Sequence, residues 1–256
     1  MKKRSRRAVA DDIVRVPFSS ATKHHIVNIL RLNLEPLSRL EPSLILPDSV
    51  VVDALSEFLQ KNLRHHISDW DLSSEVSRKY LISDFLHEAT YRCKSSLKIK
   101  PELPLNYEHD GLCFNGYMDL AISGDGLQSH LLVVEAKRDW ALGEGLNQLL
   151  CEAGCLLRSR EKLDKKTPIL AVLSDALHFQ FFAVDERNGT VYRSKVIYVD
   201  LANISDFRRD PQTIEVIRWL IWFLQIFVAV SPSSSPRDWS SEKQFSRLQE
   251  LRRCFT

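Results

Sequence analysis

Apolar residues recur at helical spacing in several stretches of the chain, and these stretches predict its helices. The predicted helices lie at two or three places within 21–67, at 73–97, at about 142–160 and at 212–229. Pro47-Asp48-Ser49 is a helix-start pattern just before residues 51–63. Ser73 and Ser74 are expected to begin the longer helix that follows.

Between these helices, stretches rich in β-branched and apolar residues predict strands. They lie at 97–105, 113–122, 130–139, 167–175, 178–185 and 190–201. The turn-rich residues 123–129 and the pair Asn188-Gly189 are expected to close hairpins. The alternation of helices and strands predicts an α/β protein with a central mixed β-sheet flanked by helices.

The composition divides the chain into four parts. Residues 1–20 are expected to form a basic, disordered arm, and residues 21–70 a small helical segment that precedes the main domain. The main domain is expected to span 71–230. Residues 231–256 begin as a Ser- and Pro-rich linker and are expected to end in a short helix.

The most apolar run is residues 219–230. It is twelve residues long and contains Gln225, whereas a membrane span needs about 20 apolar residues, so no membrane partner is expected. The run therefore predicts a buried core helix. The alternative is a homodimer that forms through the aromatic helix 214–230.

The net charge is only +2, which excludes a cationic coat over the whole molecule. The first seven residues, MKKRSRR, carry five positive charges and leave the rest of the chain slightly acidic. Such an arm is typical of a nuclear-import signal or a phosphate-binding tail, and no secretory signal follows it, so we expect the nucleus or the cytoplasm. Five cysteines without a CxxC pair predict neither a disulfide framework nor a zinc module.

Charged residues interrupt two predicted strands that are otherwise apolar. Glu135 and Lys137 share one face of the strand 130–139, and Asp119 lies among apolar residues of the strand before it. Antiparallel pairing would bring Asp119 beside Glu135. Two carboxylates and the backbone carbonyl of Ala136 are hard oxygen ligands of the kind that Mg²⁺ prefers. The alternative is a structural ion pair at a sheet edge.

Asp119, then Glu135-Ala136-Lys137, then Gln148 on the next helix resemble the PD-(D/E)XK, or restriction-endonuclease-like, nuclease superfamily over about residues 73–200. The hairpin pattern after that helix is similar to nuclease-like domains of fungal and oomycete Crinkler-type effectors. Met118 stands where the family often has proline. The resemblance implies a restriction-endonuclease-like core, a Mg²⁺ (or Mn²⁺) cofactor held by Asp119, Glu135 and the Ala136 carbonyl, Lys137 beside the attacking water, and products with 5′-phosphate ends.

The family usually adds an acidic residue on the helix before the first strand, and two glutamates are candidates. Glu75 projects within the apolar face of the helix 73–97 and is favoured, whereas Glu88 lies at the edge of that face. A first-turn charge that the helix dipole favours is the other interpretation of Glu75.

Gln148 lies nearly opposite the apolar stripe of its helix. It shares that side with Glu144, Glu152 and Cys155. This side of the helix is expected to look either onto the site or into water.

These patterns predict metal-dependent phosphodiester hydrolysis of nucleic acid, DNA in the first place. The alternative is a non-catalytic nuclease-fold effector that binds DNA or protein in the nucleus. Basic residues within 92–100 and 158–166 are candidate phosphate contacts, with solvated faces as the alternative.

Overall fold

The structure is a computed structural model that describes residues 13–93, 97–123, 130–136, 142–164, 167–204, 206–230 and 249–255, with the backbone alone for 130–136, 142–144 and 229–230. The helical elements are η1 (Phe18–Ser20), η2 (His25–Ile29), η3 (Glu35–Ser38), α1 (Glu57–Asp69), α2 (Glu75–Cys93), α3 (Leu142–Glu161) and α4 (Pro211–Val230). The strands are β1 (Val14–Pro17), β2 (Lys98–His109), β3 (Leu112–Ser123), β4 (His130–Ala136), β5 (Ile169–Ser174), β6 (His178–Val184), β7 (Val191–Arg193) and β8 (Ile197–Tyr198). The fold is mixed α/β, as the sequence predicts.

The described strands form a single mixed sheet. Its order is β1-β3-β4-β5-β6-β7, with β2 paired to β3 and β8 paired to β6. β2, β3 and β4 are antiparallel neighbours, and β5 is parallel to β4 because α3 crosses between them. On β3, β1 pairs with residues 112–115 and β4 with residues 120–123, so positions 116–119 lie between these two partners.

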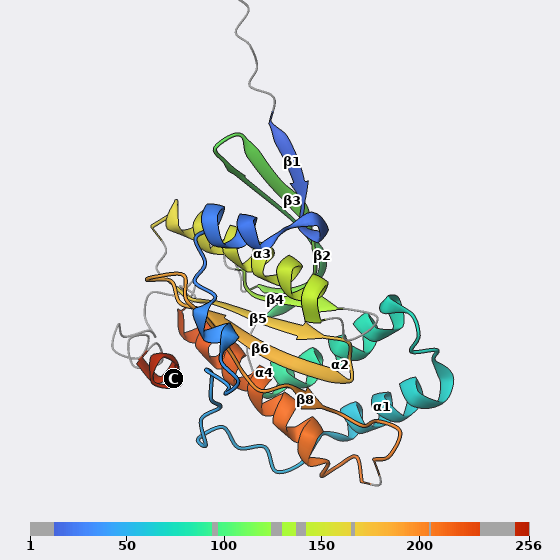
Figure 1. The fold of residues 1–256 in the computed structure, drawn as a ribbon. Helices are drawn as coiled ribbons and strands as arrows, with labels where there is room; N and C mark the ends of the chain where they lie inside the picture. The colour runs from blue at the N-terminus through green and yellow to red at the C-terminus, as the bar shows by residue number, and fades with distance from the viewer. Residues whose placement is uncertain are drawn as a thin grey trace, which may run out of the picture.

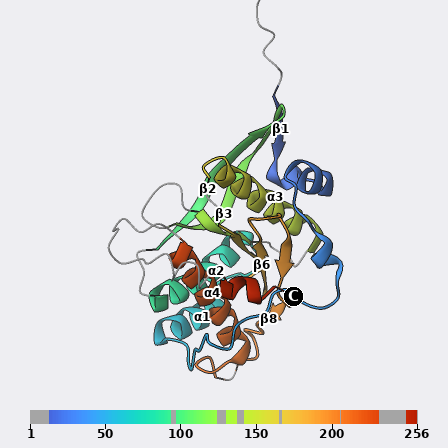
Figure 2. The same ribbon diagram turned by 90° about the vertical axis from the view of Figure 1, so that its left-hand side faces the viewer.

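Helices cover both faces of the sheet (Figures 1 and 2). On one face lies α3, which packs against the N-terminal turns η1 and η2. The N-terminal segment packs closely on both elements: a Cβ added at Gly116 of β3 would lie 2.7 Å from the Phe18 ring, and one at Gly154 of α3 would lie 3.0 Å from Leu30. On the other face α2 and α4 pack against each other. The sheet therefore separates an α3 side from an α2 side.

The apolar run at 219–230 lies within α4 and is a core helix, as predicted. Trp219, Trp222, Phe223 and Phe227 are at most 2% exposed. Phe181 of β6 stacks on Trp219 with ring centroids 5.1 Å apart. The expectation of a dimer face on this helix is wrong for these aromatic side chains, because the chain itself buries them. Within the described ranges, no helix combines the length and apolarity that a membrane crossing requires.

The expected boundary of the arm at residue 20 is wrong. β1 pairs in parallel with β3, and Phe18 is only 2% exposed. Residues from 13 onward therefore belong to the sheet and its core, and the helical segment 21–70 contributes to the same hydrophobic core. Residues 1–12, which include the basic run 1–7, lie outside the described part of the chain.

The helix expected over residues 51–63 begins later than predicted. Residues 51–55 are not helical, and α1 begins at Glu57 after Ser56, whose hydroxyl oxygen accepts a hydrogen bond from the Leu59 amide at 3.2 Å. Ser56 is therefore the N-cap. The pattern at Pro47-Asp48-Ser49 does not start a helix.

The turn between β2 and β3 joins the two longest strands into a ribbon. Asp110 and Gly111 have φ angles of 47° and 75°, the left-handed pair that a tight hairpin turn requires. The Asp-Gly pair is a strong hairpin signal, but it was not among the predicted turns. Figure 1 shows this ribbon, with β1 beside it, extending beyond the helical layers.

Candidate active site

The pairing of β3 with β4 brings two of the predicted site positions together. Leu120 lies opposite Val134, so one further step in the same register sets Asp119 opposite Glu135. On the other side of β4, Glu135 pairs with Leu173 and Ala136 with Ser174. Positions 119, 135 and 136 are thus neighbours where β4 and β5 end beside the middle of β3.

Asp119 is held by a lysine of α2 that was not predicted. The Lys79 Nζ lies 2.6 Å from Asp119 Oδ1 and 3.3 Å from Glu75 Oε1. Burial lowers the pKa of Lys79, but hydrogen bonds and charge pairing with Asp119 and Glu75 outweigh this and raise the pKa above its ordinary value. Lys79 is therefore a fixed cation between the two carboxylates.

A second ion pair fixes the same end of α2 over the sheet. The Arg78 guanidinium donates to the backbone carbonyl of Asp175 at 2.9 Å and lies 3.4 Å from its carboxylate. Asp175 directly follows β5, and its carboxylate also accepts from the backbone amide of His178. The first turns of α2 are thus anchored at the strand ends where β4 and β5 lie side by side.

The two candidate upstream acids differ in place. Glu75 is joined to Asp119 through Lys79. Its expected burial is wrong, because the side chain is 45% exposed. Val76, the next residue, is 60% exposed as well, and the buried residues of α2 begin only at Leu81, so its first turn lies at the surface. Glu88 is the buried residue, at 1% exposure.

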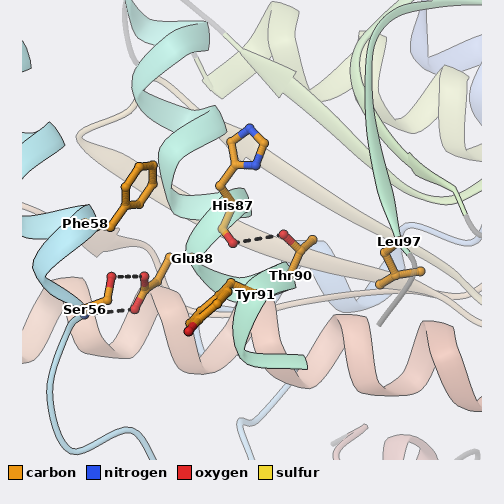
Figure 3. A pocket seen from close by; sticks show the side chains of 7 residues that line it. All are labelled: Ser56, Phe58, His87, Glu88, Thr90, Tyr91 and Leu97. Carbon is orange, nitrogen blue, oxygen red and sulfur yellow. Dashed lines mark hydrogen bonds between the residues drawn. The ribbon is translucent and has the colours of Figure 1, made fainter. Parts of the chain in front are cut away.

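Glu88 belongs to a structural network at the other end of α2. It accepts hydrogen bonds from the Ser56 amide at 3.1 Å, from the Ser56 hydroxyl and from Arg92 Nε at 2.7 Å. Figure 3 shows Glu88 and Ser56 facing each other beside Phe58 and Tyr91, which line a pocket of about 670 Å³. Nine residues of helix, ~13 Å, separate Glu88 from Lys79. This pocket therefore does not adjoin Asp119.

The described hydrogen-bond partner of Gln148 lies on its own helix. The side-chain amide of Gln148 donates to Glu152 Oε1 at 3.1 Å, one turn along α3. Glu152 and Cys155 are fully buried, so this side of α3 does not face water. The described hydrogen bond ties Gln148 to α3 and not to Asp119.

Only part of the predicted metal site lies within the described residues. Among the described side chains, no three His, Cys, Asp or Glu residues come together as a metal group. The side chain of Glu135 and the whole of Lys137 lie outside the described part of the chain. The donor types at positions 119, 135 and 136 suit Mg²⁺, and Asp119 is 12% exposed. A metal on Asp119 would have to share that carboxylate with Lys79.

Glu102 was also missed, and it occupies the position opposite Asp119 on β2. Pro101 pairs with Leu120 and Leu103 with Met118, which leaves Glu102 facing Asp119. Its φ of 49° is left-handed, which is unusual for a glutamate within a strand. Prolines at 101 and 104 are the sequence signal of an interrupted strand here. Three acidic positions thus share one row across β2, β3 and β4.

Several predicted phosphate contacts are engaged within the fold. Arg92 binds Glu88 and the Ala54 carbonyl, and Arg158 donates to the Leu30 carbonyl at 2.8 Å. Arg160 is 5% exposed, and burial lowers its pKa to about 10. The stretches 92–100 and 158–166 therefore do not form continuous basic surfaces along their described residues.

No known family model matches this chain, and a comparison with curated proteins finds no relative.

Proposed function

We propose that this protein hydrolyses phosphodiester bonds in nucleic acid, DNA in the first place, at a metal-dependent site of the PD-(D/E)XK kind. The observation that carries the proposal is the β3–β4 register, in which Asp119 comes opposite Glu135. The element order supports it: a helix with Glu75, the strand with Asp119, the strand with Glu135-Ala136, then the helix with Gln148. This is the order that the resemblance implies for a restriction-endonuclease-like core.

Each residue has a chemical role in this proposal. Asp119, Glu135 and the Ala136 carbonyl would hold the cation, and Lys137 would orient the attacking water. A bound Mg²⁺ or Mn²⁺ supplies charge neutralisation at the phosphate and a lowered pKa for water. Lys79 positions the Asp119 carboxylate, and Glu75 restrains Lys79 from the solvent side. The attack would leave 5′-phosphate ends, and the basic residues 1–7 would direct the protein to the nucleus.

The second candidate is a non-catalytic protein with this fold that binds DNA or protein. One observation favours it: the Lys79 ammonium lies 2.6 Å from the Asp119 carboxylate, in a place where a metal cation would otherwise bind. In such a protein the lysine would replace the metal permanently. Glu135→Gln would then leave its binding unchanged.

The test is cleavage of supercoiled plasmid and of single-stranded DNA with Mg²⁺ or Mn²⁺. Asp119→Asn should lower the rate by about 100-fold or more, since it removes a metal ligand. Asp110→Asn is the matched control, because Asp110 is an exposed aspartate in the turn of the same ribbon. An unchanged rate in Asp119→Asn would overturn the proposal, and a wild-type protein that binds DNA without cleaving it would establish the second candidate.

A further inference from the structure

The face of β3 that carries Asp119 continues away from the site as a polar surface. Side chains alternate along a strand, so Cys113, Asn115 and Tyr117 share the face of Asp119. The opposite face carries Phe114, Met118 and Leu120, which are at most 3% exposed and belong to the α3 side of the core. One face of the ribbon is thus buried at these positions, whereas the other runs from Cys113, which is 9% exposed, to the exposed Tyr117.

Tyr117 is the most notable residue of this open face. Its side chain is 64% exposed, although it lies only two residues, ~7 Å, from Asp119 along β3. Its cross-strand neighbour is Pro104, which is also exposed. Tyr117 and Pro104 together form an exposed apolar patch next to the proposed site.

The far end of the same face contains a hollow of about 470 Å³. It is lined by Ile13, Arg15, Asn106, Glu108, Cys113 and Asn115. Asn106 and Asn115 are cross-strand neighbours, and the side-chain oxygen of Asn115 has no hydrogen-bond partner among the described residues. A buried acceptor without a donor is unfavourable, and a donor from a ligand would remove that cost.

We propose that this face of β1, β2 and β3 binds a single strand of nucleic acid and leads it to Asp119; the inference rests on the proposed function. Tyr117 would stack on the base beside the reacting phosphate. The paired asparagines would hydrogen-bond bases further along the strand. Arg15 at the far end and Lys100, opposite Ala121 on β2, would contact the backbone.

The dimensions of the surface favour a single strand over a duplex. A B-DNA major groove is about 12 Å wide and admits a two-stranded ribbon. Here β1 adds a third strand, which places the outer strands ~10 Å apart before any side chain is counted. Exposed bases of a single strand, by contrast, can stack on Tyr117.

The charges on this face predict how the affinity depends on salt. Glu108 lies in the same hollow as Arg15, so the local charges partly cancel, and stacking and hydrogen bonds should contribute more to the affinity than net charge does. Two cationic contacts on a single strand predict a slope of log K against log salt of about −1.4. A protein that coats nucleic acid with many cations would give a much steeper slope.

The experiment measures fluorescence anisotropy of a labelled 12-nucleotide oligothymidine, with Ca²⁺ in place of Mg²⁺ and the strand checked for integrity. Tyr117→Ala should weaken binding about 5- to 150-fold, the effect of losing one base–aromatic stack, and Tyr117→Phe should retain the binding. Tyr91→Ala is the matched control, since Tyr91 is 79% exposed and lies at the far end of α2. An oligouridine of the same length distinguishes RNA from DNA as the strand.

Three results overturn the inference: equal binding by Tyr117→Ala, equal losses in the Tyr117 and Tyr91 variants, or binding of a blunt duplex without binding of the single strand. Cleavage of plasmid by the wild-type protein in any of these cases would leave the proposed function standing. Tyr117-dependent binding without any cleavage would uphold the inference and refute the nuclease. Thermal unfolding of each variant shows that it is folded.

Discussion

Each end of α2 takes part in a network around one carboxylate, and the two networks differ in the partners and in the solvent exposure of that carboxylate. At the C-terminal end, Glu88 is 1% exposed and accepts hydrogen bonds from Ser56 and Arg92. At the N-terminal end, Asp119 is 12% exposed and meets the ammonium of Lys79, which it shares with Glu75. The first network buries its central carboxylate between α1 and α2, whereas the central carboxylate of the second keeps some exposure to solvent.

The difference separates a structural acid from a candidate functional one. A buried carboxylate with donors from several segments fixes those segments relative to each other, and removing it leaves the donors unsatisfied. A carboxylate that meets an ammonium near solvent can exchange that ammonium for another cation. Sequence pattern alone made Glu75 the acid aimed into the core, whereas the chain uses Glu88 for that purpose.

The largest effect that tests this comparison is expected from Glu88→Ala. The change removes the carboxylate partner of Arg92 and of the Ser56 amide, and it weakens the attachment of α1 to α2. The free energy of unfolding should fall by about 3 kcal/mol, near the lower end for a broken buried pair because Arg92 is 27% exposed. Urea denaturation measures it, and cleavage per folded molecule should not change.

Glu75→Ala is the control for this loss. Its ion pair with Lys79 is exposed, so the expected change is less than about 0.5 kcal/mol. A loss as large as that of Glu88→Ala would contradict the distinction between the two ends of α2.

A smaller and more specific effect is expected when each network loses its cation. Lys79→Met removes the ammonium from Asp119, and Arg92→Met removes the guanidinium from Glu88. Mg²⁺ at ten times its Kd stabilises a folded protein by about 1.4 kcal/mol. Lys79→Met should gain more from a given Mg²⁺ concentration than the wild-type protein does, because the ammonium no longer competes for Asp119.

Calorimetric Tm values with and without Mg²⁺ provide the measurement. Arg92→Met should respond to Mg²⁺ as the wild-type protein does, because Glu88 stays enclosed by Ser56. Equal responses in both variants would show that Asp119 is no more open to a cation than Glu88.

The fold was predictable where local pattern is strong. The helices expected at 142–160 and 212–229 are Leu142–Glu161 and Pro211–Val230, because long apolar stripes determine them. β1 was missed because four residues carry little pattern and its partner β3 lies almost a hundred residues away. The start of α1 was misplaced because Glu88, 32 residues further along, binds its N-cap Ser56.

The candidate site was predictable only in part, for a similar reason. Asp119 and Glu135 stand out because a charge within an apolar strand is unusual, and the β3–β4 register then sets the two positions opposite each other. Lys79 lies four residues after Glu75, and in the sequence this spacing indicates only an ordinary ion pair on the surface of a helix. Its contact with Asp119 is a product of tertiary structure that no local pattern contains.

The smallest effect concerns Glu102, the acidic position opposite Asp119. Its φ of 49° costs the folded state about 1–2 kcal/mol in a residue with a Cβ, and glycine removes that cost. Glycine also raises the entropy of the unfolded chain, which destabilises the folded state by about 0.4–1 kcal/mol. Glu102→Gly should therefore raise the free energy of unfolding by about 0.5–1 kcal/mol, whereas Glu102→Ala keeps the strain and should not. Urea denaturation of the two variants measures the difference, and equal stabilities would show that the backbone here is unstrained. If both variants also lose cleavage equally, the Glu102 carboxylate itself contributes to the open network around Asp119, and the strain is what a functional residue imposes on the strand.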